Sequence, residues 1–522
     1  MNRFTSALVA GTAALTLAGC FGSSSDVAVT HVFNLGTPNI FDPAIPDEAD
    51  FFIDPNDPDV TTAAAIAFDE VQNGQVIEFG CGWFEINTDL AFSDIDGAII
   101  RGCGKNETVL SFAGSPGGNG ILVQNAEGIL IQGLTVVDTP DDGIRAENSD
   151  GVTMRDVRSI WSRESDPITE ANYTTAIHVD CPAHGEEATY ITDAAQSGKY
   201  GLYPTDSRNV LMEDSEAIGA WDAGLYIGQS EDVILRNNRA AFNVAGIEIE
   251  NTNRADAYNN VSECNTAGLM IFNLPGRPFY GDQVRATDNL LRNNNNENFA
   301  SSGFIQNLPP GLGLMVMAKD QVEARDNLIE DNNTTGVIIV SHQLLDETGV
   351  DSAGMNDLQL NPWPDAVNIS GNAFSNNGND PDTDNLLALL LVTANDGQGG
   401  AHIIWDGFID EVNPACAAPT EVDHFDARGK PQYRNDPDPA CRYNAYKFDG
   451  AGERVKPDFW ICAENNTFEA QDAPNFFNVA NSLEFDEDGN IIGVSGDPDN
   501  DASPHSCQAQ FGSTLPLARP AR

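Results

Sequence analysis

One position of a repeated octapeptide carries side chains that suit the recognition of sugars. The octapeptides DDGIRAEN, KYGLYPTD, DAGLYIGQ and VAGIEIEN begin at residues 141, 199, 222 and 244. Their fifth residues are Arg145, Tyr203, Tyr226 and Glu248, and Glu250 follows two positions later. Aromatic faces can pack on the C–H groups of a sugar ring, while charged groups bind its hydroxyls. We therefore predict that these five residues form a carbohydrate-binding face.

Carboxyl groups near the same position could also perform catalysis. Hydrolysis of a glycosidic bond uses two carboxyl groups about 5–10 Å apart, a spacing that neighbouring strands can provide. The catalytic candidates are Tyr200, Asp206, Asp222 and Glu248. Three functions stay open: carbohydrate binding without catalysis, which we favour; a polysaccharide lyase, epimerase or glycoside hydrolase acting on a surface or extracellular glycan; and a non-enzymatic scaffold for a protein partner.

The elements that position these residues follow from the repeat. Three more octapeptides with glycine third, TAGLMIFN, GLGLMVMA and TTGVIIVS, begin at 266, 311 and 334, so the successive spacings are 58, 23, 22, 22, 45 and 23. The two long spacings contain insertions. A repeat of 22 residues with a second strand and a polar turn has no room for a helix. The pattern predicts an all-β protein, a single-stranded right-handed parallel β-helix with three short strands in each coil of ~22 residues.

The alternation of side chains within a strand sets which residues face outward. Two stacked outward columns follow: Arg145, Tyr203, Tyr226, Glu248, Met270, Met315 and Ile338; and Glu147, Thr205, Gly228, Glu250, Phe272, Met317 and Val340. Their first halves are polar and their second halves apolar. Because a large exposed apolar patch is usually covered or binds a partner, we expect the insertions 273–280 and 295–310, or the C-terminal segment, to cover it. We expect the insertion 161–197 to shield the polar half.

Paired asparagines mark the turns. Asn238 and Asn260 are 22 residues apart, as are Asn243 and Asn265, and the spacing N-x4-N returns at 289/294, 327/332 and 372/377. Stacked turn asparagines form amide ladders that satisfy buried polar groups. These residues are therefore expected to be structural rather than ligand-binding.

The chain divides into four predicted segments: a signal peptide at 1–19, an extended linker at 20–58, the β-helix at 59–480 and a loop-rich tail at 481–522. An alanine-rich stretch, 61–72, follows Asp59 and predicts a short N-terminal capping helix. Residues 386–392 and 402–408 are predicted coil strands, and 461–468 the last rung.

The N-terminus resembles a bacterial lipoprotein signal. A short charged start and an apolar run to Leu17 end in L-A-G-C, where Cys20 is the expected lipidation site. Phe21 follows it in place of the aspartate typical of inner-membrane retention. We predict an outer-membrane lipoprotein, facing the periplasm or the cell surface, whose lipid anchor is its one membrane attachment.

Eight further cysteines predict disulfides in an oxidising compartment. Cys81 and Cys103 occupy the same phase of VIEFGCG and AIIRGCG, 22 residues apart. Stacked positions lie about 4.8 Å apart, which suits a disulfide, so we predict Cys81–Cys103. Cys416, Cys441, Cys462 and Cys507 are expected to pair among themselves, in an order that the sequence leaves open.

Charge and spacing limit the ligands. With 79 acidic and 26 basic residues, the net charge is −53, which argues against nucleic acid and anionic lipid as partners. A polyanionic sugar would need a local basic patch or bridging cations. His178, Cys181 and His184 have a metal-like spacing but lack a fourth ligand, so no metal site is assigned. Aspartates 380/382/384 and 497/499/501 could bind Ca²⁺, the one cofactor considered.

The quoted octapeptides resemble the bacterial parallel β-helix repeat lipoproteins, a family of uncharacterised function, over residues 75–380. That resemblance implies a redox or surface partner such as a c-type cytochrome-like protein. More distantly the chain is similar to pectate-lyase-like β-helices and to mannuronan C5-epimerases, whose catalytic strand reads Y-G-F-D-P-H-[DE]. Here Tyr200, Gly201, Pro204 and Asp206 match, but Tyr203 and Thr205 replace the Asp and His. The loss of those two proton-transfer groups argues against epimerisation or elimination by that mechanism.

Overall fold

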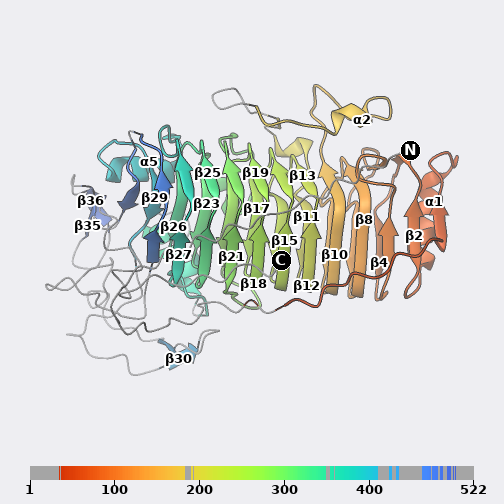
Figure 1. Ribbon diagram of the computed structural model, residues 1–522, viewed down its shortest axis with the longest axis horizontal. Helices are drawn as coiled ribbons and strands as arrows, with labels where there is room; N and C mark the ends of the chain where they lie inside the picture. Colours follow the sequence, from red (N-terminus) through yellow and green to blue (C-terminus); the bar gives the residue numbers. More distant parts are fainter. Residues whose placement is uncertain are drawn as a thin grey trace, which may run out of the picture.

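The computed structural model describes residues 35–408, apart from 36, 183–189, 192, 348–352 and 358, and the shorter stretches 422–425, 431–433, 461–471, 473–479, 482–485, 491–494, 498 and 500. The chain is a right-handed parallel β-helix, as the repeat predicts (Figure 1). Its coils stack along one long axis, with the N-terminal helix α1 at one end.

One wall of the helix is an 11-stranded parallel sheet, here called sheet B, which contains all seven octapeptides. Its strands are β4 (Leu90–Ser93), β7 (Ile121–Gln124), β9 (Ile144–Glu147), β11 (Tyr200–Thr205), β14 (Ala223–Gly228), β17 (Ala245–Glu250), β20 (Ala267–Phe272), β23 (Leu312–Met317), β26 (Thr335–Val340), β29 (Ala401–Trp405) and β34 (Phe476–Asn478).

The other two walls are parallel ladders that the long strands β8 (Glu127–Val137) and β10 (Asp150–Ile160) join into one sheet, sheet A. The first ladder also contains β1 (Phe51–Ile53), β2 (Val76–Phe79), β5 (Ile99–Arg101), β12 (Arg208–Glu213), β15 (Glu231–Arg236), β18 (Asn253–Tyr258), β21 (Val284–Thr287), β24 (Val322–Arg325), β27 (Val367–Ser370) and β32 (Ile461–Glu464). The second contains β3 (Gly82–Glu85), β6 (Thr108–Ser111), β13 (Glu216–Ile218), β16 (Arg239–Ala241), β19 (Val261–Glu263), β22 (Leu290–Arg292), β25 (Leu328–Glu330), β28 (Ala373–Ser375) and β33 (Thr467–Phe468).

The register of sheet B confirms both predicted outward columns. Tyr203 pairs with Arg145, Tyr226 with Glu248, and Glu248 with Met270. Met270 in turn pairs with Met315, and Met315 with Ile338. The alternate residues, such as Leu225 and Ile247, lie in the buried core inside the coils. The hydrophobic period of two therefore fixes the face of each side chain.

The repeated glycine is required by close packing at the start of each strand of sheet B. A Cβ atom on Gly201 would lie 2.4 Å from the carbonyl oxygen of Gly224, and one on Gly268 would lie 2.4 Å from that of Gly313. Backbone atoms cannot move aside as a flexible side chain can, so any larger residue would separate the rungs.

The two predicted asparagine ladders are present in the turns. In the first, the amide nitrogen Nδ2 of Asn238 donates to Oδ1 of Asn260 at 3.0 Å, and the series continues through Asn289, Asn327 and Asn372 to Asn466. In the second, the series runs from Asn243 through Asn265, Asn294 and Asn332 to Asn377. All but Asn466 are buried, so the ladders satisfy turn groups that would otherwise lack partners.

The N-terminal end is capped as predicted. Helix α1 (Val60–Glu70) begins after Asp59, whose side chain accepts a bond from the Thr62 backbone nitrogen. The disulfide Cys81–Cys103 is also confirmed, with 5.4 Å between the Cα atoms. Strand β1 pairs with β2 and so adds a rung strand within the segment predicted as a linker. Upstream of it the chain runs along the outside of the coils, where Asp42 pairs with Arg155 at 2.9 Å (Figure 1).

The C-terminal rungs agree with the prediction except at one element. Residues 401–405 form β29, and 461–468 contain β32 and β33. Residues 386–392, however, are helical: α5 spans Leu386–Ala394. The prediction of a strand there is wrong because the run is leucine-rich and has no alternation. Asn385 caps the helix by accepting bonds from the backbone nitrogens of Leu387 and Ala388.

Short elements complete the chain: α2 (Tyr173–Ala176), the 3-10 turns Ala194–Gln196 and Phe304–Asn307, α3 (His342–Glu347), α4 (Ala353–Asn356), and the antiparallel pairs β30 (Val422–Phe425) with β31 (Pro431–Tyr433) and β35 (Leu483–Phe485) with β36 (Ile491–Val494). Within the described part of the chain, no helix is long and apolar enough to cross a membrane.

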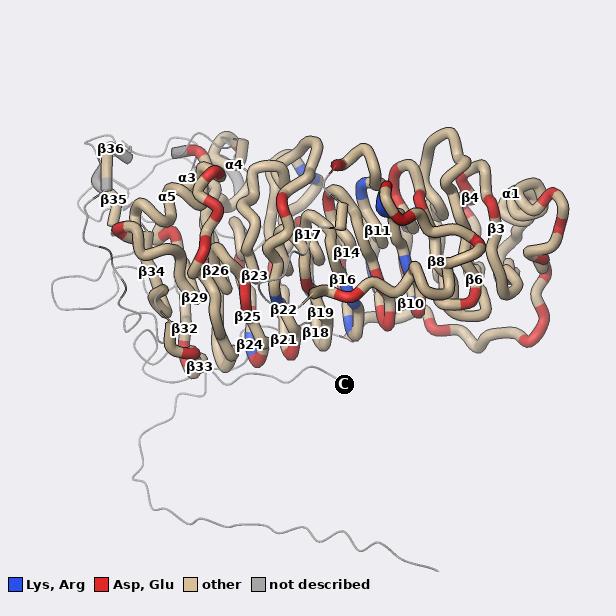
Figure 2. The backbone as a smooth tube through the Cα atoms, turned by 90° about the horizontal axis from the view of Figure 1, so that it is seen from above, with Lys and Arg blue, Asp and Glu red and all other residues tan. Residues whose placement is uncertain are grey.

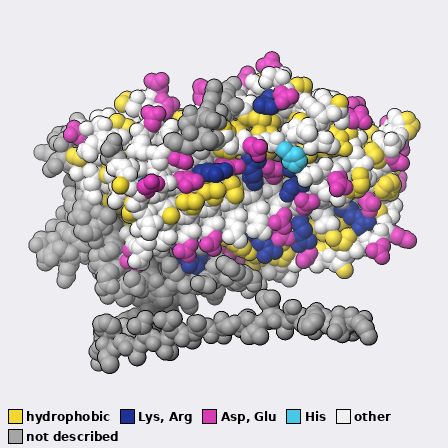
Figure 3. Space-filling model, turned by 45° about the horizontal axis from the view of Figure 1, so that its top comes forward, with side chains coloured by type: hydrophobic (Ala, Val, Ile, Leu, Met, Phe, Trp, Pro, Cys, Tyr) yellow, Lys and Arg dark blue, Asp and Glu magenta, His cyan; other side chains and the backbone are white. Residues whose placement is uncertain are grey.

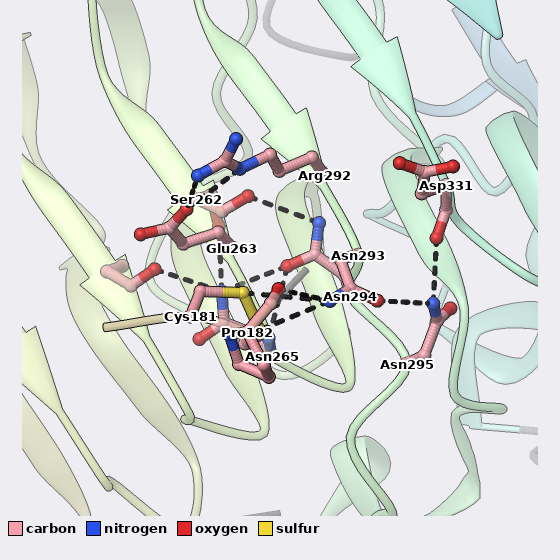
Figure 4. The surroundings of a disulfide bond; sticks show 12 residues. Cys181, Pro182, Ser262, Glu263, Asn265, Arg292, Asn293, Asn294, Asn295 and Asp331 are labelled. Atoms are coloured by element: carbon pink, nitrogen blue, oxygen red, sulfur yellow. Dashed lines mark hydrogen bonds and ion pairs between the residues drawn. A yellow bond between two sulfur atoms is a disulfide. The ribbon is translucent and has the colours of Figure 1, made fainter. Parts of the chain in front are cut away.

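The insertion that contains α2 is tied to the coils by a second disulfide, Cys181–Cys264 (Figure 4). The Asn293 side chain lies beside it and donates to the carbonyl oxygen of Pro182 at 3.4 Å. Because Cys181 is oxidised, it cannot ligate a metal, and His184 lies outside the described residues. Cys462 is disulfide-bonded, whereas Cys20, Cys416, Cys441 and Cys507 also lie outside that part of the chain.

Ion pairs run from rung to rung across the outside of sheet A, where arginine and glutamate alternate from one strand to the next. Figure 2 shows basic and acidic positions near one another on these strands. Arg158 Nε contacts Glu216 Oε2 at 2.5 Å, and Glu216 Oε1 contacts Arg239 at 2.6 Å. Arg239 continues to Glu263 at 2.8 Å, which pairs with Arg292 at 2.7 Å. These carboxylates are each held between two guanidinium groups, an arrangement we call the sheet A ion-pair ladder.

Candidate functional site

Three tyrosines are in mutual contact on the outer face of β11 and β14. The ring centroids of Tyr200 and Tyr203 are 4.5 Å apart, those of Tyr200 and Tyr226 4.5 Å, and those of Tyr203 and Tyr226 4.8 Å. Tyr226 is buried at 2 % exposure, while Tyr200 and Tyr203 are partly exposed. Small residues in the strands that follow, Ala223 and Ala245, leave room for the Tyr200 ring because they share its column.

Cationic side chains lie over the exposed edge of the tyrosine cluster. The Arg145 guanidinium is 4.8 Å from the Tyr203 ring centroid, and Lys199 Nζ is 4.6 Å from that of Tyr200. Lys199 also lies 5.7 Å from the Trp221 ring, which is itself partly exposed. Cation–π contacts of this kind favour a fixed ring position. The surface of the site is thus an aromatic and cationic rim.

Below the rim, Glu250 is the centre of a hydrogen-bond network. It accepts from the Tyr226 hydroxyl at 2.8 Å and from Gln229 Nε2 at 2.9 Å, and it pairs with Arg277 Nε at 2.8 Å. Burial raises the pKa of Glu250, while Arg277 and the two hydrogen bonds oppose that shift. Arg277 comes from the insertion after β20, so this loop contributes directly to the site.

Two buried aspartates titrate near neutral pH. Burial raises the pKa of Asp222 to about 7, with Lys199 opposing the shift and Glu250 adding to it. Lys199 Nζ lies 3.8 Å from Asp222 Oδ2, and the Tyr200 hydroxyl favours the charged form of the carboxylate. Burial also raises the pKa of Asp142 to about 7, although Arg145 contacts it at 3.4 Å.

Glu248 differs from these carboxyl groups because it has no partner. Its residue is 3 % exposed, and it makes no hydrogen bond or ion pair with any residue that the structure describes. Burial raises its pKa well above the ordinary value, and the neighbouring Asp222 and Glu250 add to that shift while Lys199 opposes it.

The structure brings most of the predicted residues together and corrects their exposure. Arg145, Tyr203, Tyr226, Glu248 and Glu250 all face out of the coil, but the last three are buried. The partly exposed members of the predicted binding face are therefore Arg145 and Tyr203. Tyr200 and Asp222 join the cluster. Asp206 is not part of the buried cluster: it follows β11, its side chain is exposed, and it accepts a hydrogen bond from the Thr205 hydroxyl at 3.5 Å.

Sequence reasoning missed the site residues that lie outside the two predicted outward columns. Lys199 and Trp221 precede the strands, Gln229 follows β14, and Arg277 lies in an insertion. Asp142 is the second residue of its octapeptide, and its burial had no signal in the alternation. The local sequence signal for Lys199 and Trp221 is that each belongs to a doublet of a charged and an aromatic residue, Lys199-Tyr200 and Trp221-Asp222.

The apolar half of the outward columns is fully covered. Met270, Phe272, Met315, Met317, Ile338 and Val340 are each no more than 2 % exposed. Phe304 and Leu308 of the insertion 295–310, Leu345 of α3 and Leu387 of α5 pack over this half and line a small apolar pocket with it. The predicted cover by that insertion is confirmed. An exposed apolar column for a docking partner is absent from the described residues.

No cluster of three metal-ligating side chains lies at the tyrosine site within the described part of the chain. The one such group there, Cys81, Cys103 and Glu107, contains the disulfide. Asp380, Asp382 and Asp384 are exposed. The Asp382 side chain accepts a hydrogen bond from the Asp384 backbone nitrogen. Aspartates 497, 499 and 501 lie outside the described residues, so Ca²⁺ binding stays a prediction.

The sequence matches the family model described as "Right handed beta helix region" over residues 96–284. No curated protein matches the chain. Among solved structures, it is similar to the A-module of the mannuronan C-5 epimerase AlgE6 of Azotobacter vinelandii, at 16 % identity over 69 % of this chain and 80 % of that one, with a TM-score of 0.46.

It is also similar to the alginate lyase of Paenibacillus sp. str. FPU-7, at 14 % identity over 63 % of this chain and 94 % of that one, with a TM-score of 0.31. It is similar as well to pectate lyase Pel9A, at 12 % identity over 78 % of this chain and 94 % of that one, with a TM-score of 0.32. These likenesses concern the fold alone. They agree with the distant resemblance to pectate-lyase-like and epimerase-like β-helices.

Proposed function

We propose that the outer face of β9, β11, β14 and β17 binds carbohydrate. The observation that carries this proposal is the rim of Tyr200, Tyr203 and Trp221 with Arg145 and Lys199 over the rings. Partly exposed aromatic faces bind the C–H surface of a sugar, and the charged groups beside them bind hydroxyls. Buried carboxyl groups below the rim add further hydrogen-bonding groups. Solved proteins of similar fold are described as acting on mannuronan, alginate and pectate.

The basic groups of the rim are relevant to the charge of the sugar. A chain of net charge −53 repels a polyanion, yet Arg145, Lys199 and Arg277 gather here with their side chains 27 %, 36 % and 40 % exposed. On one face of the molecule, Figure 3 shows basic side chains near the middle, among acidic and hydrophobic ones. The site therefore contains the local basic groups that binding of a sugar acid would require.

Binding is tested with the mature chain carrying Cys20→Ser, which cannot be lipidated, on an array of neutral and acidic glycans. We expect at least one glycan to bind, and Tyr203→Ala to weaken that binding by about 1–3 kcal/mol through loss of a stacking contact. Phe52→Ala is the matched control, because Phe52 is an exposed aromatic residue on β1, at the N-terminal end of the helix. Absence of binding to every glycan, or equal loss in both variants, contradicts the proposal.

The cellular setting is a separate proposal. We infer a lipoprotein of the outer membrane, anchored through Cys20, on the basis of the L-A-G-C signal alone. Cys20→Ser should move the protein from the membrane fraction to the soluble fraction. Unchanged fractionation would refute the lipid anchor. The scaffold alternative, with a partner such as a c-type cytochrome-like protein, stays a prediction; the apolar half of the outward columns is covered by the chain itself and is not exposed to such a partner.

A further inference from the structure

A lysine is completely enclosed beside the insertion that follows β20. Lys319 lies two residues after β23 and is 0 % exposed. Its Nζ donates hydrogen bonds to the backbone oxygen of Thr252 at 2.6 Å and to Oδ1 of Asn273 at 3.3 Å. Both acceptors are uncharged, and within the described part of the chain Lys319 forms no ion pair. Full burial without an ion pair favours the neutral amine.

The carboxamide beside that amine is held in one orientation. Asn273 is 3 % exposed and follows β20, the strand that pairs with β23. Its Nδ2 donates to the carbonyl oxygens of Ala318 at 2.9 Å and Gly281 at 3.2 Å, and its Oδ1 accepts from the Gly281 nitrogen at 3.3 Å. These bonds direct Oδ1 toward Nζ of Lys319. Because a C=O bond is about 1.2 Å long, the amide carbon Cγ lies within about 4.5 Å of Nζ.

A neutral amine that is fixed next to a carboxamide can attack its carbon. The attack uses the lone pair of the amine, which an ammonium group does not have. Burial lowers the pKa of Lys319 to about 7, although the charges of Asp282, Asp320 and Glu250 oppose the shift, so the neutral form is populated at neutral pH. The two N–H groups of the neutral amine match the two acceptors that Nζ contacts. Holding both groups together in a buried site replaces the high concentration that the reaction requires in solution.

We propose that Lys319 and Asn273 form an isopeptide cross-link without the help of another enzyme. In the step, Nζ of Lys319 forms a bond to Cγ of Asn273, and the bond between Cγ and Nδ2 breaks. One proton of Nζ passes to Nδ2, which leaves as ammonia. The product is a secondary amide whose remaining N–H donates to Thr252, and the step requires no oxidant or cofactor. This inference does not rest on the proposed carbohydrate binding.

The cross-link joins two neighbouring rungs of sheet B directly after their last residue pair, Phe272 with Met317. It also fastens the base of the loop 273–281, because Asn273 bonds both backbone groups of Gly281. Arg277, which pairs with Glu250, is carried by this loop. The covalent bond therefore holds the insertion in place over the outer face of the sheet.

The mass of the intact protein tests the cross-link. The folded mature chain carrying Cys20→Ser is purified, its disulfides are reduced, and its mass is compared with the mass that its sequence gives. We expect a deficit of one molecule of ammonia. Lys319→Arg and Asn273→Ala should each have the full mass of their own sequences, because neither variant can form the amide. Lys105→Arg is the matched control and should keep the deficit, since Lys105 is a partly exposed lysine that pairs with Asp156 at 3.2 Å.

Digestion of the wild-type chain with trypsin locates the bond and does not depend on how the variants fold. Acylation of Nζ prevents cleavage after Lys319, so the peptides 255–285 and 293–325 should appear joined. The first peptide stays whole because Pro278 follows Arg277. A full intact mass together with cleavage after Lys319 would overturn the inference. A deficit that persists in Lys319→Arg would overturn it as well, because the ammonia would then be lost elsewhere in the chain.

Discussion

The outer faces of the two sheets use buried carboxyl groups in opposite ways. On sheet A, Glu216 lies between Arg158 and Arg239, and these guanidinium groups hold its pKa below the ordinary value against the effect of burial. On sheet B, burial raises the pKa of Glu248 and no cation contacts it. Each of the two residues has neighbours at the spacing of one rung, because both lie on strands of the same β-helix. Glu216 is thus balanced by two ion pairs, whereas Glu248 is buried without an ion pair to any described residue, although its neighbour Glu250 has one with Arg277.

The largest effect is expected on sheet A. Glu216→Gln leaves the buried Arg158 guanidinium without its carboxylate, so the free energy of unfolding should fall by about 3–5 kcal/mol. Chemical denaturation of the variant and of wild type measures the difference. Glu231→Gln is the control, because its partner Arg254 keeps Asp232 and is partly exposed; it should change stability by no more than about 0.5 kcal/mol. An equal loss in both variants would mean that the sheet A ion-pair ladder is not specifically stabilising.

On sheet B the sign should reverse. Glu248→Met replaces an unpartnered buried acid by an apolar side chain of similar length, so we expect stability to rise by about 1–3 kcal/mol. A thermal melt and a denaturant titration give the change. A fall in stability would show that Glu248 has a structural role and that the comparison between the two faces does not hold.

The pH dependence should sharpen the contrast. Burial raises the pKa of Asp222 in the folded protein to about 7, above the ordinary aspartate value of 3.8. A raised carboxyl pKa stabilises the fold fully below pH 3.8, and that stability is lost as the pH rises through 7, at up to about 1.4 kcal/mol per pH unit. Glu216 has a lowered pKa, so its contribution to the stability of the fold is lost as the pH falls. Unfolding titrations from pH 4 to 8 should show that Asp222→Asn removes part of the decline toward high pH. An unchanged profile would contradict the assignment.

The smallest effect on stability is expected at the rim. Tyr203 is partly exposed, so Tyr203→Ala should lower the unfolding free energy by less than about 1 kcal/mol while weakening glycan binding. Tyr226→Ala should cost more, because Tyr226 is buried and its hydroxyl bonds Glu250. Thermal melts of the two variants give the comparison. If Tyr203→Ala melts as low as Tyr226→Ala, the rim is packing rather than a binding surface.

Much of the fold could be read from local patterns. The strict period of two within each octapeptide fixed the register from Arg145 to Ile338, and the asparagine spacing predicted both ladders. The pairing of Cys81 with Cys103 followed from the 22-residue repeat. The pattern failed at 386–392, where a leucine-rich run without alternation forms α5. A short apolar run is compatible with strand or helix, and its contacts over the apolar column decide between them.

The sequence by itself determined which residues face outward, because a parallel β-helix repeats one local geometry and every side chain inherits its direction from the strand period. It could not determine which outward residues are covered. That depends on where the insertions return to the coils: the loop carrying Arg277 lies over Glu250, the segment with Phe304 and Leu308 packs over the methionines, and Cys181 binds Cys264 from 83 residues away. Burial, and with it the raised pKa of Glu248 and Asp222, is a product of those long-range contacts. Only the tertiary structure therefore decided which carboxyl groups have a raised pKa.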